Sequence, residues 1–182
     1  MKNVYHAIFY SHIVYGIEVW GSACDSHLKA IQILQNRVVR LLTYNDQFPT
    51  IPGPLPASSP LFCKLRLLKI KDLFILRVCI FIHTCLFNAL LTNFEDWFKF
   101  SVNIHNYETR LNFNIASESL TNNLFIPSAR TSNYGLKLLK VNGPRIWNSI
   151  PVGVRTAMSI TTFKSLLKDH LLSKYNELLN IT

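Results

Sequence analysis

Residues 70–91 constrain the fold of this 182-residue chain most, because apolar side chains occur on nearly every side of a helix drawn through them. A helix that is apolar all round is buried, either in a protein core or in a membrane. The stretch 73–91 is almost long enough to span a bilayer, but Arg77, His83 and Asn88 fall inside it. We therefore expect the central helix of a soluble core, and a small membrane-associated helical protein is the least favoured alternative.

Apolar residues recur at helical spacing in three further segments, 2–21, 26–43 and 161–178. The segment 26–43 is amphipathic, with a predicted apolar side made of Ile31, Leu34, Val38, Leu41 and Leu42. Its opposite side carries Lys29, Arg37 and Arg40, and no carboxylate lies between the first and the last of them. These patterns predict a mainly α fold.

Prolines divide the chain, since residues 45–60 hold five of the eight. Such a stretch is typical of a linker or a long surface loop. We expect a helix pair over 1–44, a proline-rich linker over 45–60 and a helical C-terminal domain with short strands over 61–182. Pro60 is suited to open a short helix that runs to Leu68, because its missing N–H is not needed there.

Helical periodicity fades between residues 101 and 142, where Asn, Ser and Thr are dense. Short extended pieces are expected at 124–126 and 136–141, within a small β-containing subdomain near 101–150. The sequence GPRIWNSIP (143–151) follows, and its glycine and two prolines predict a short, pre-shaped turn. We interpret Trp147 and Ile150 as structural anchors on that turn.

The charge balance favours a polyanionic partner. Nineteen Lys and Arg against ten Asp and Glu give a net charge of +9, which suits nucleic acid or an anionic membrane surface. None of the four cysteines forms a CxxC pair. We therefore expect reduced thiols in a reducing, intracellular compartment, nuclear or cytoplasmic.

The residue patterns of known catalytic sites are missing from the sequence. It contains no Asp-Asp pair, no glycine-rich phosphate loop and no GxSxG motif. The histidines and cysteines do not have metal-ligand spacing. We expect no catalytic residue, no metal site, no cofactor and no small-molecule substrate.

Aromatic, basic and amide residues alternate in three stretches: IHNYETR (104–110), ARTSNYG (129–135) and GPRIWN (143–148). Aromatic rings beside guanidinium groups suit single-stranded nucleic acid or a duplex backbone. The competing interpretation is that the rings are core or turn anchors and that the arginines pair with backbone carbonyls. For Trp147 we favour the anchor, and for Arg110, Arg130 and Arg145 both interpretations stay open.

These stretches, followed by SITTFKSLLKDHLLSKY (159–175), resemble in their order the C-terminal region of non-LTR (LINE-type, jockey-like) retrotransposon reverse transcriptases. The N-terminal half is similar as well, through YSHIVYGIEVWGSA (10–23), LKAIQILQNRVVRLLT (28–43) and PLFCKLRLLKIKDLF (60–74). The resemblance covers about residues 5 to 175. It implies a thumb-like helical bundle that follows the polymerase palm and grips the template–primer.

The resemblance leaves out the catalytic parts of that family, because the aromatic-x-Asp-Asp turn, the earlier palm aspartate and the nuclease carboxylates have no counterpart here. Two-metal phosphoryl transfer needs those carboxylates. We expect a truncated, non-catalytic fragment that binds RNA or an RNA–DNA template–primer, with the missing palm and fingers as a second partner. A membrane is the least favoured partner. The expected contacts are Lys29, Arg37, Arg40, Arg110, Arg130, Tyr134, Lys140 and Arg145, with Trp20, Trp147 and Ile150 as anchors. The alternative is a relic without activity, whose exposed apolar faces make it associate.

Overall fold

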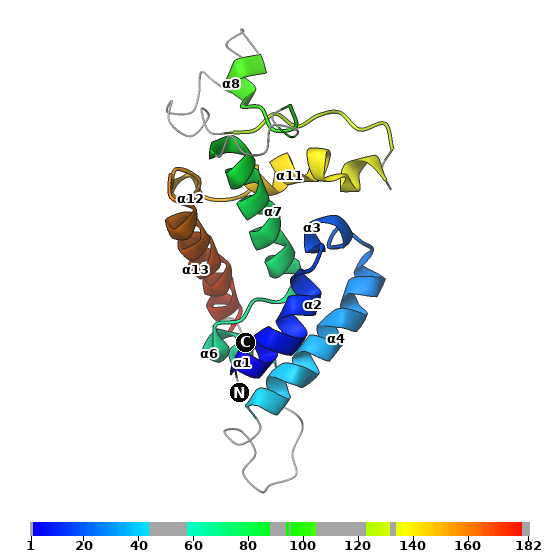
Figure 1. Cartoon of the computed structure of the whole chain (residues 1–182), viewed down its shortest axis with the longest axis vertical. Helices are drawn as coiled ribbons and strands as arrows, with labels where there is room; N and C mark the ends of the chain where they lie inside the picture. Colours follow the sequence, from blue (N-terminus) through cyan, green and yellow to red (C-terminus); the bar gives the residue numbers. More distant parts are fainter. Residues whose placement is uncertain are drawn as a thin grey trace, which may run out of the picture. The chain divides into compact units, whose positions relative to one another are not determined.

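The computed structural model describes residues 2–43, 58–87, 94, 96–104, 123–131 and 134–179 (Figure 1). These residues are mostly helical, which confirms the predicted mainly α class. The chain divides into two compact units. Unit 1 contains Met1–Phe74 and Lys168–Thr182, and unit 2 contains Ile75–Leu167. The linker predicted over 45–60 lies outside the described residues except for its last three positions.

The N-terminal segment of unit 1 is interrupted rather than a single helix. The chain runs through α1 (Lys2–Val4), the π-helical turn η1 (Tyr5–Tyr10) and α2 (Ser11–Val14). Tyr15 is then extended, and Gly16 takes a φ of 63° before α3 (Ile17–Trp20) begins. The helix predicted over 2–21 therefore breaks at Gly16, because glycine adopts this left-handed conformation without a steric penalty.

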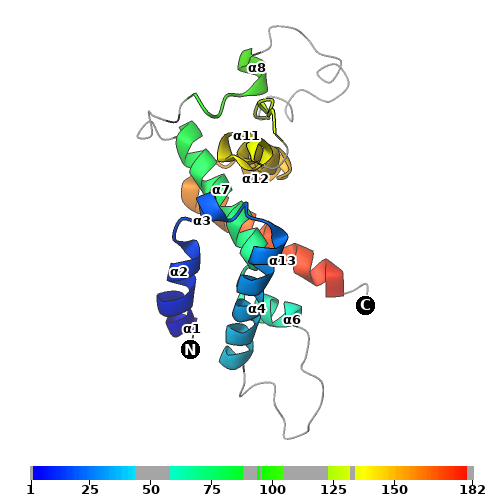
Figure 2. The ribbon, with the colours of Figure 1, turned by 90° about the vertical axis from the view of Figure 1, so that its right-hand side faces the viewer.

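Helix α4 (Asp25–Leu42) lies beside α1 and α2 in both ribbon views (Figures 1 and 2). Its predicted apolar side is wrong in part, because Leu34 and Leu41 are 52% and 67% exposed. The side that packs against the rest of unit 1 contains Leu28, Val39 and Gln35, which is fully buried. Gln35 can occupy the core because its amide donates to the Tyr5 hydroxyl and to the Leu68 carbonyl.

Helix α6 (Ser59–Leu65) has a proline in its first turn, as predicted for Pro60. It ends at Leu65, three residues before the predicted limit at Leu68, and the residue that follows, Arg66, has a φ of 53°. Leu61 and Phe62 from this helix are buried. Gln35 and Leu68 thus join α4 to the chain that follows the proline-rich stretch.

The core of unit 2 is built on α7 (Ile70–Phe87), where Val78, Cys79 and Ile82 are fully buried. The core helix predicted over 70–91 is confirmed for residues 70–87, and residues 88–91 lie outside the described part of the chain. Helix α11 (Leu139–Asn148) crosses α7 (Figures 1 and 2), and Gly143 permits the close approach. A Cβ atom on Gly143 would lie 3.2 Å from the side chain of Ile82 and equally close to that of Phe98.

Helices α12 (Val152–Arg155) and α13 (Ile160–Leu179) follow α11. The ring of Trp147 stacks on that of Phe163, with a centroid separation of 5.5 Å. Phe163 in turn stacks on His83, whose Nε2 is 2.9 Å from the Ala157 carbonyl oxygen. In the part of the chain that the structure describes, no helix combines the length and the apolarity needed to cross a membrane.

The predicted β-containing subdomain is not seen in the described residues of 101–150. Phe100 and Leu124 form an isolated antiparallel bridge, and the Asn148 side chain exchanges two hydrogen bonds with the Leu124 backbone. The predicted strand over 136–141 is wrong, because η3 (Gly135–Lys137) and α11 occupy it. The turn predicted for GPRIWNSIP is also wrong, because residues 143–148 belong to α11. Gly143 and Pro144 are buried there, and this packing stabilises the helix. The short helix α8 (Ser101–Ile104) comes directly before residues 105–122, which lie outside the described part of the chain.

Candidate functional site

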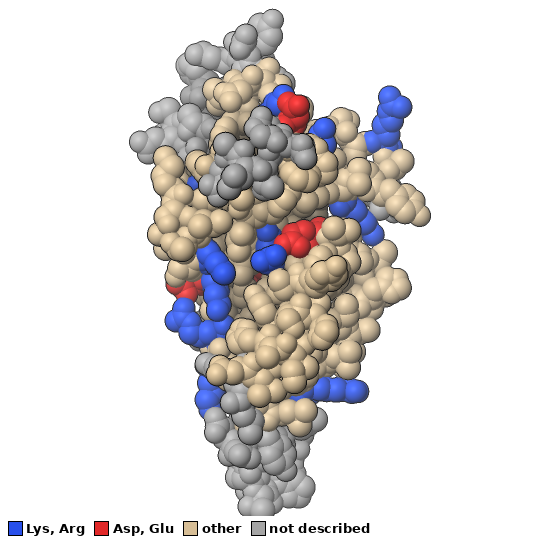
Figure 3. Space-filling view, viewed as in Figure 1, with Lys and Arg blue, Asp and Glu red and all other residues tan. Residues whose placement is uncertain are grey.

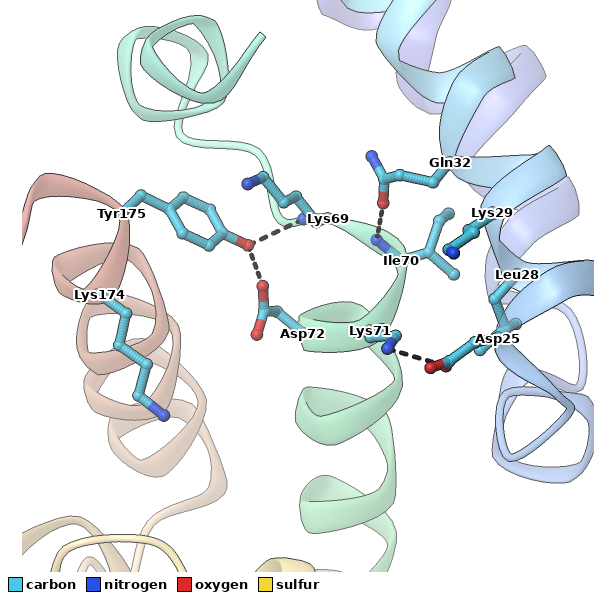
Figure 4. Close-up of a pocket in the computed structure, with 10 residues that line it drawn as sticks. All are labelled: Asp25, Leu28, Lys29, Gln32, Lys69, Ile70, Lys71, Asp72, Lys174 and Tyr175. Atoms are coloured by element: carbon cyan, nitrogen blue, oxygen red, sulfur yellow. Dashed lines mark hydrogen bonds and ion pairs between the residues drawn. The ribbon is translucent and has the colours of Figure 1, made fainter. Parts of the chain in front are cut away.

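A cavity of about 490 Å³ in unit 1 lies among α4, the start of α7 and the C-terminal part of α13 (Figure 4). Leu28 and Ile70 supply apolar walls, and both are buried. The ring of Tyr175, which is 4% exposed, supplies a third. The volume is within the usual range for cavities that hold small organic ligands.

Side chains from two other helices hold the start of α7. The Gln32 side-chain oxygen accepts a hydrogen bond from the Ile70 N–H at 3.0 Å. The Tyr175 hydroxyl accepts one from the Lys69 N–H at 3.0 Å and donates another to the Asp72 carboxylate. These bonds satisfy N–H groups that have no partner within a helix. Burial, and then the Asp72 charge, raise the pKa of Tyr175 well above its usual range, so the phenol stays protonated.

Four lysines and two aspartates line the cavity, and both carboxylates are engaged. Asp25 pairs with Lys71 at 2.8 Å, and Asp72 accepts from Tyr175. Lys69 donates to the Ser59 hydroxyl and lies 4.8 Å from the centre of the Tyr175 ring. The cavity therefore has an excess of positive charge.

Lys29 and Lys174 supply the remaining two ammonium groups. Both side chains are exposed, and Figure 4 shows them on opposite walls, on α4 and on α13. Among the described residues, neither forms a hydrogen bond or an ion pair. The amide of Gln32 is fully used, since its nitrogen donates to Gln35 and Asn36. The polar groups left for a ligand are thus cationic.

The structure distributes the predicted nucleic-acid contacts over both units. In unit 1, Lys29 and Arg37 are exposed on α4, whereas Arg40 is half-buried. In unit 2, the exposed residues are Arg130, Tyr134, Lys140 and Arg145. Arg110 lies outside the described residues. On the face shown in Figure 3, lysine and arginine atoms stand at several separate places, with carboxylates beside some of them.

The three predicted anchors differ in burial. Trp147 and Ile150 are 1% and 4% exposed in the core of unit 2. Trp20 is half-buried in unit 1, and its indole N–H donates to the Tyr15 carbonyl at 2.9 Å across Gly16.

Sequence reasoning missed Lys174, Tyr175 and Gln32 as members of one site. Tyr175 falls within the segment 161–178 that was predicted as a helix from its apolar spacing, and its side chain is buried. Its hydrogen bonds join positions more than 100 residues apart, and helical periodicity does not encode such pairs. The run of lysines at 64, 69 and 71 was the available signal, because it precedes the start of α7.

No group of three or more metal-ligating side chains occurs among the described residues. The four cysteines form no disulfide with one another. Burial raises the pKa of the Cys79 thiol strongly and that of Cys85 to about 11, so both are protonated at neutral pH.

Comparison with known proteins gives a partial similarity. A segment of 46 residues, 25% of this chain, is 50% identical to the probable RNA-directed DNA polymerase from transposon X-element of Drosophila melanogaster. The matched segment covers 5% of that protein, so the chain corresponds to a small part of the relative. No protein-family model matches the chain, and no solved structure matches it. Part of the chain is therefore related to a retrotransposon reverse transcriptase.

Proposed function

We propose that this chain corresponds to the thumb-side, C-terminal region of a non-LTR retrotransposon reverse transcriptase. In this proposal it binds RNA or an RNA–DNA template–primer and does not itself polymerise. The observation that carries the proposal is the 50% identity over 46 residues to an RNA-directed DNA polymerase. The absence of an Asp-Asp pair from all 182 residues supports the non-catalytic part. The palm and fingers of a polymerase are the proposed protein partner.

The exposed cations support phosphate binding. Lys29 and Arg37 in unit 1, and Lys140 and Arg145 in unit 2, extend from helices into solvent. Lysine and arginine bind nucleic acid chiefly by neutralising phosphates and releasing counterions. Tyr134 is 82% exposed, close in sequence to Arg130, and such a ring is available to stack on a base.

The test is fluorescence anisotropy with a labelled, recessed RNA–DNA primer–template at roughly 50 and 200 mM salt, where phosphate-driven binding changes steeply. We expect binding that weakens sharply at the higher salt, and that weakens further in Arg130→Ala and Arg145→Ala. Lys164→Ala is the matched control, because Lys164 is exposed and lies outside the proposed contact set. Absence of binding by a folded, monodisperse sample at low salt would refute the proposal.

A second candidate is a relic without activity, and one observation favours it. Unit 1 exposes large apolar side chains on its first helices and on α4, namely Val4, Ile8, Tyr15, Val19, Ile33, Leu34 and Leu41. Exposed apolar surface of this kind promotes association when no partner covers it. Concentration-dependent association in sedimentation experiments, with no affinity for the primer–template, would identify this case.

A further inference from the structure

We infer that unit 1 pairs with a second copy of this chain through an apolar surface, which we call the outer face. The outer face contains side chains from the N-terminal helical segment and from α4, namely Val4, Ile8, Tyr15, Leu34, Val38 and Leu41. This surface is separate from the exposed cations of the proposed function, so the pairing does not depend on that function.

The N-terminal helical segment lacks the charged side that a helix facing water usually has. Between Asn3 and Ile17 the chain contains no Lys, Arg, Asp or Glu. Nevertheless Val4, Ile8 and Tyr15 are 58%, 63% and 86% exposed. The other polar side chains exposed on this segment belong to asparagine, histidine and serine. Depletion of charge together with exposed large apolar residues is typical of the middle of a protein–protein interface.

Helix α4 contributes a second apolar stripe. Leu34, Val38 and Leu41 have the i, i+4 and i+7 spacing that places side chains on one side of a helix. Leu34 and Leu41 are 52% and 67% exposed, and Val38 is half-buried. Arg37 flanks this stripe, so its charge belongs to the solvated rim of a contact made there. The apolar side of α4 is therefore wider than the part that unit 1 buries.

The two stripes lie on neighbouring helices. α4 lies beside α1 and α2 in both ribbon views (Figures 1 and 2), and the Gln35 amide donates to the Tyr5 hydroxyl between them. Leu34 directly precedes Gln35, and Ile8 follows Tyr5 by about one helical turn. In Figure 3, most of the surface over α1, α2 and α4 shows no lysine, arginine or carboxylate atoms, which appear at its edges.

Charge and geometry favour a second copy as the occupant. The chain has a net charge of +9, so two copies repel each other wherever their lysines and arginines meet. The outer face allows them to approach without opposed charges at its centre. The N-terminal segment and α4 run in opposite directions (Figure 1), and they form one layer of a helical bundle. A second such layer, related by a twofold axis, buries both apolar sides in a closed four-helix arrangement.

The size of the outer face determines how tight the pairing is. Its six apolar side chains are fewer than the 20–30 residues, about 800 Å², that each partner contributes to a standard interface. We therefore expect a reversible dimer with a dissociation constant on the order of 10 μM.

The experiment is analytical ultracentrifugation of the full chain at roughly 1 to 100 μM, a range that brackets this dissociation constant. The test variants are Ile8→Lys and Leu34→Lys, which place a charge in each stripe. The matched control is Leu138→Lys, because it adds the same charge at a leucine of unit 2 that is 60% exposed. Circular dichroism verifies that each variant is folded.

We expect the native chain to show a monomer–dimer equilibrium. Ile8→Lys and Leu34→Lys should each weaken it by more than about tenfold, because a charge inside the contact loses its water or meets a like charge. Leu138→Lys should have little effect. A native chain that stays monomeric, open-ended aggregation without a dimer, or equal weakening by Leu138→Lys would each overturn the inference.

Salt provides a second readout. Raising it from roughly 50 to 200 mM should strengthen the dimer, since screening reduces the repulsion between two positively charged chains. The same change weakens binding to nucleic acid, because that binding depends on phosphate contacts. Association that weakens with salt would overturn a pairing through the uncharged outer face.

A mixing experiment distinguishes a second copy from any other occupant. Leu34 lies at the middle of α4, so a twofold axis through the centre of the layer brings its two copies near each other. Leu34→Lys and Leu34→Glu, each weakly associating alone, should therefore form a dimer when they are mixed. If the mixture associates no better than its components, the outer face is covered by something other than a second copy, and the inference is wrong.

Primer–template binding, measured by fluorescence anisotropy on the same preparations, separates this pairing from the proposed function. Ile8→Lys leaves Arg130 and Arg145 intact and should bind the primer–template as the native chain does. A dimer without affinity for the primer–template supports the pairing and refutes the proposed function. Primer–template binding by a chain that stays monomeric refutes the pairing and leaves the proposed function intact.

Discussion

The side-chain nitrogen of Gln35 lies 3.0 Å from the Tyr5 hydroxyl oxygen and 2.9 Å from the Leu68 carbonyl oxygen, in the interior of unit 1. One amide on α4 thus binds both Tyr5, near the start of the chain, and Leu68, two residues before the start of α7. Gln35 is fully buried and Tyr5 is 2% exposed. A buried amide that is completely hydrogen-bonded stabilises one arrangement of these segments, because any other leaves its polar atoms without partners.

Replacing Gln35 by Ala should therefore lower the free energy of unfolding by about 2–4 kcal/mol, since a cavity forms and the Leu68 carbonyl is left buried without its donor. The measurement is urea denaturation followed by circular dichroism. Arg37→Ala is the control on the same helix. Arg37 is exposed, and its replacement should change the value by no more than about 0.5 kcal/mol. Equal effects of the two substitutions would contradict the role assigned to Gln35.

Arg145 and Trp147 should separate binding from stability. Trp147 is buried against Phe163, so Trp147→Ala should cost about 3–5 kcal/mol of unfolding free energy. Arg145 is exposed, so Arg145→Ala should leave stability almost unchanged and weaken primer–template binding. Denaturation curves and anisotropy titrations on the same preparations provide both readouts. If both variants lost stability equally and bound nucleic acid normally, this division of roles would be wrong.

Two glycines should respond in opposite directions to alanine. A Cβ atom on Gly21 would lie 2.6 Å from the Ile17 carbonyl oxygen and closer still to the Phe74 ring. Gly21→Ala should destabilise unit 1 by about 1–3 kcal/mol, because a rigid backbone atom and a packed ring must both move. Gly153 has open space at the same position, so Gly153→Ala in α12 should stabilise by about 0.5–1 kcal/mol. The measurement is thermal unfolding of the two variants and the native chain. A Gly21→Ala protein as stable as the native chain would disprove the packing described for Gly21.

Tyr175 should make stability depend on alkaline pH. Burial and Asp72 raise the pKa of Tyr175 in the folded state above its ordinary value of 10.0. Below about pH 10 the phenol is protonated in both states, and its contribution to stability is fully present. As the pH rises further, the unfolded chain loses this proton while the folded chain retains it, so the contribution falls.

The measurement is urea denaturation of the native chain and of Tyr175→Phe at pH values on both sides of 10. We expect Tyr175→Phe to be less stable at neutral pH by about 1 kcal/mol and to lose less stability above pH 10. The Cys85 thiol, with its pKa raised from 9.0 to about 11, adds a similar fall in both proteins, so the difference isolates Tyr175. Tyr134→Phe, at an exposed position, should follow the native curve. Identical slopes for native chain and Tyr175→Phe would contradict the prediction.

Helical periodicity predicted the class of the fold and several of its elements. The apolar run over 70–87 is a core helix, and Pro60 opens α6, because both follow from local rules of burial and backbone geometry. The pattern failed on α4, where Leu34 is exposed and Gln35 is buried. Apolarity alone cannot identify a polar residue whose hydrogen-bond partners are distant in sequence. The cavity of unit 1 could not be predicted for the same reason, since it depends on Tyr175 meeting Lys69 and Asp72.

The prediction for the stretch around Gly143 and Pro144 was also wrong. Local rules predicted a turn there, but the structure has the helix α11. Inside a helix, glycine costs about 1 kcal/mol and proline about 3 kcal/mol relative to alanine. The helix exists because Gly143 fits against Ile82 and Phe98, and because Trp147 stacks on Phe163. Tertiary packing thus outweighs intrinsic propensity at this position.

That imbalance has a consequence for the order in which the chain assembles. A helix with glycine and proline in its interior has almost no tendency to form alone. We therefore expect residues 139–148 to be unstructured before the rest of the protein folds. It acquires its shape only after Ile82, Phe98 and Phe163 are in position to receive it. An isolated peptide of residues 136–150 should accordingly give a coil spectrum by circular dichroism. We expect α11 to form after the longer helices during folding. Substitutions within α11 should therefore increase the unfolding rate far more than they decrease the folding rate.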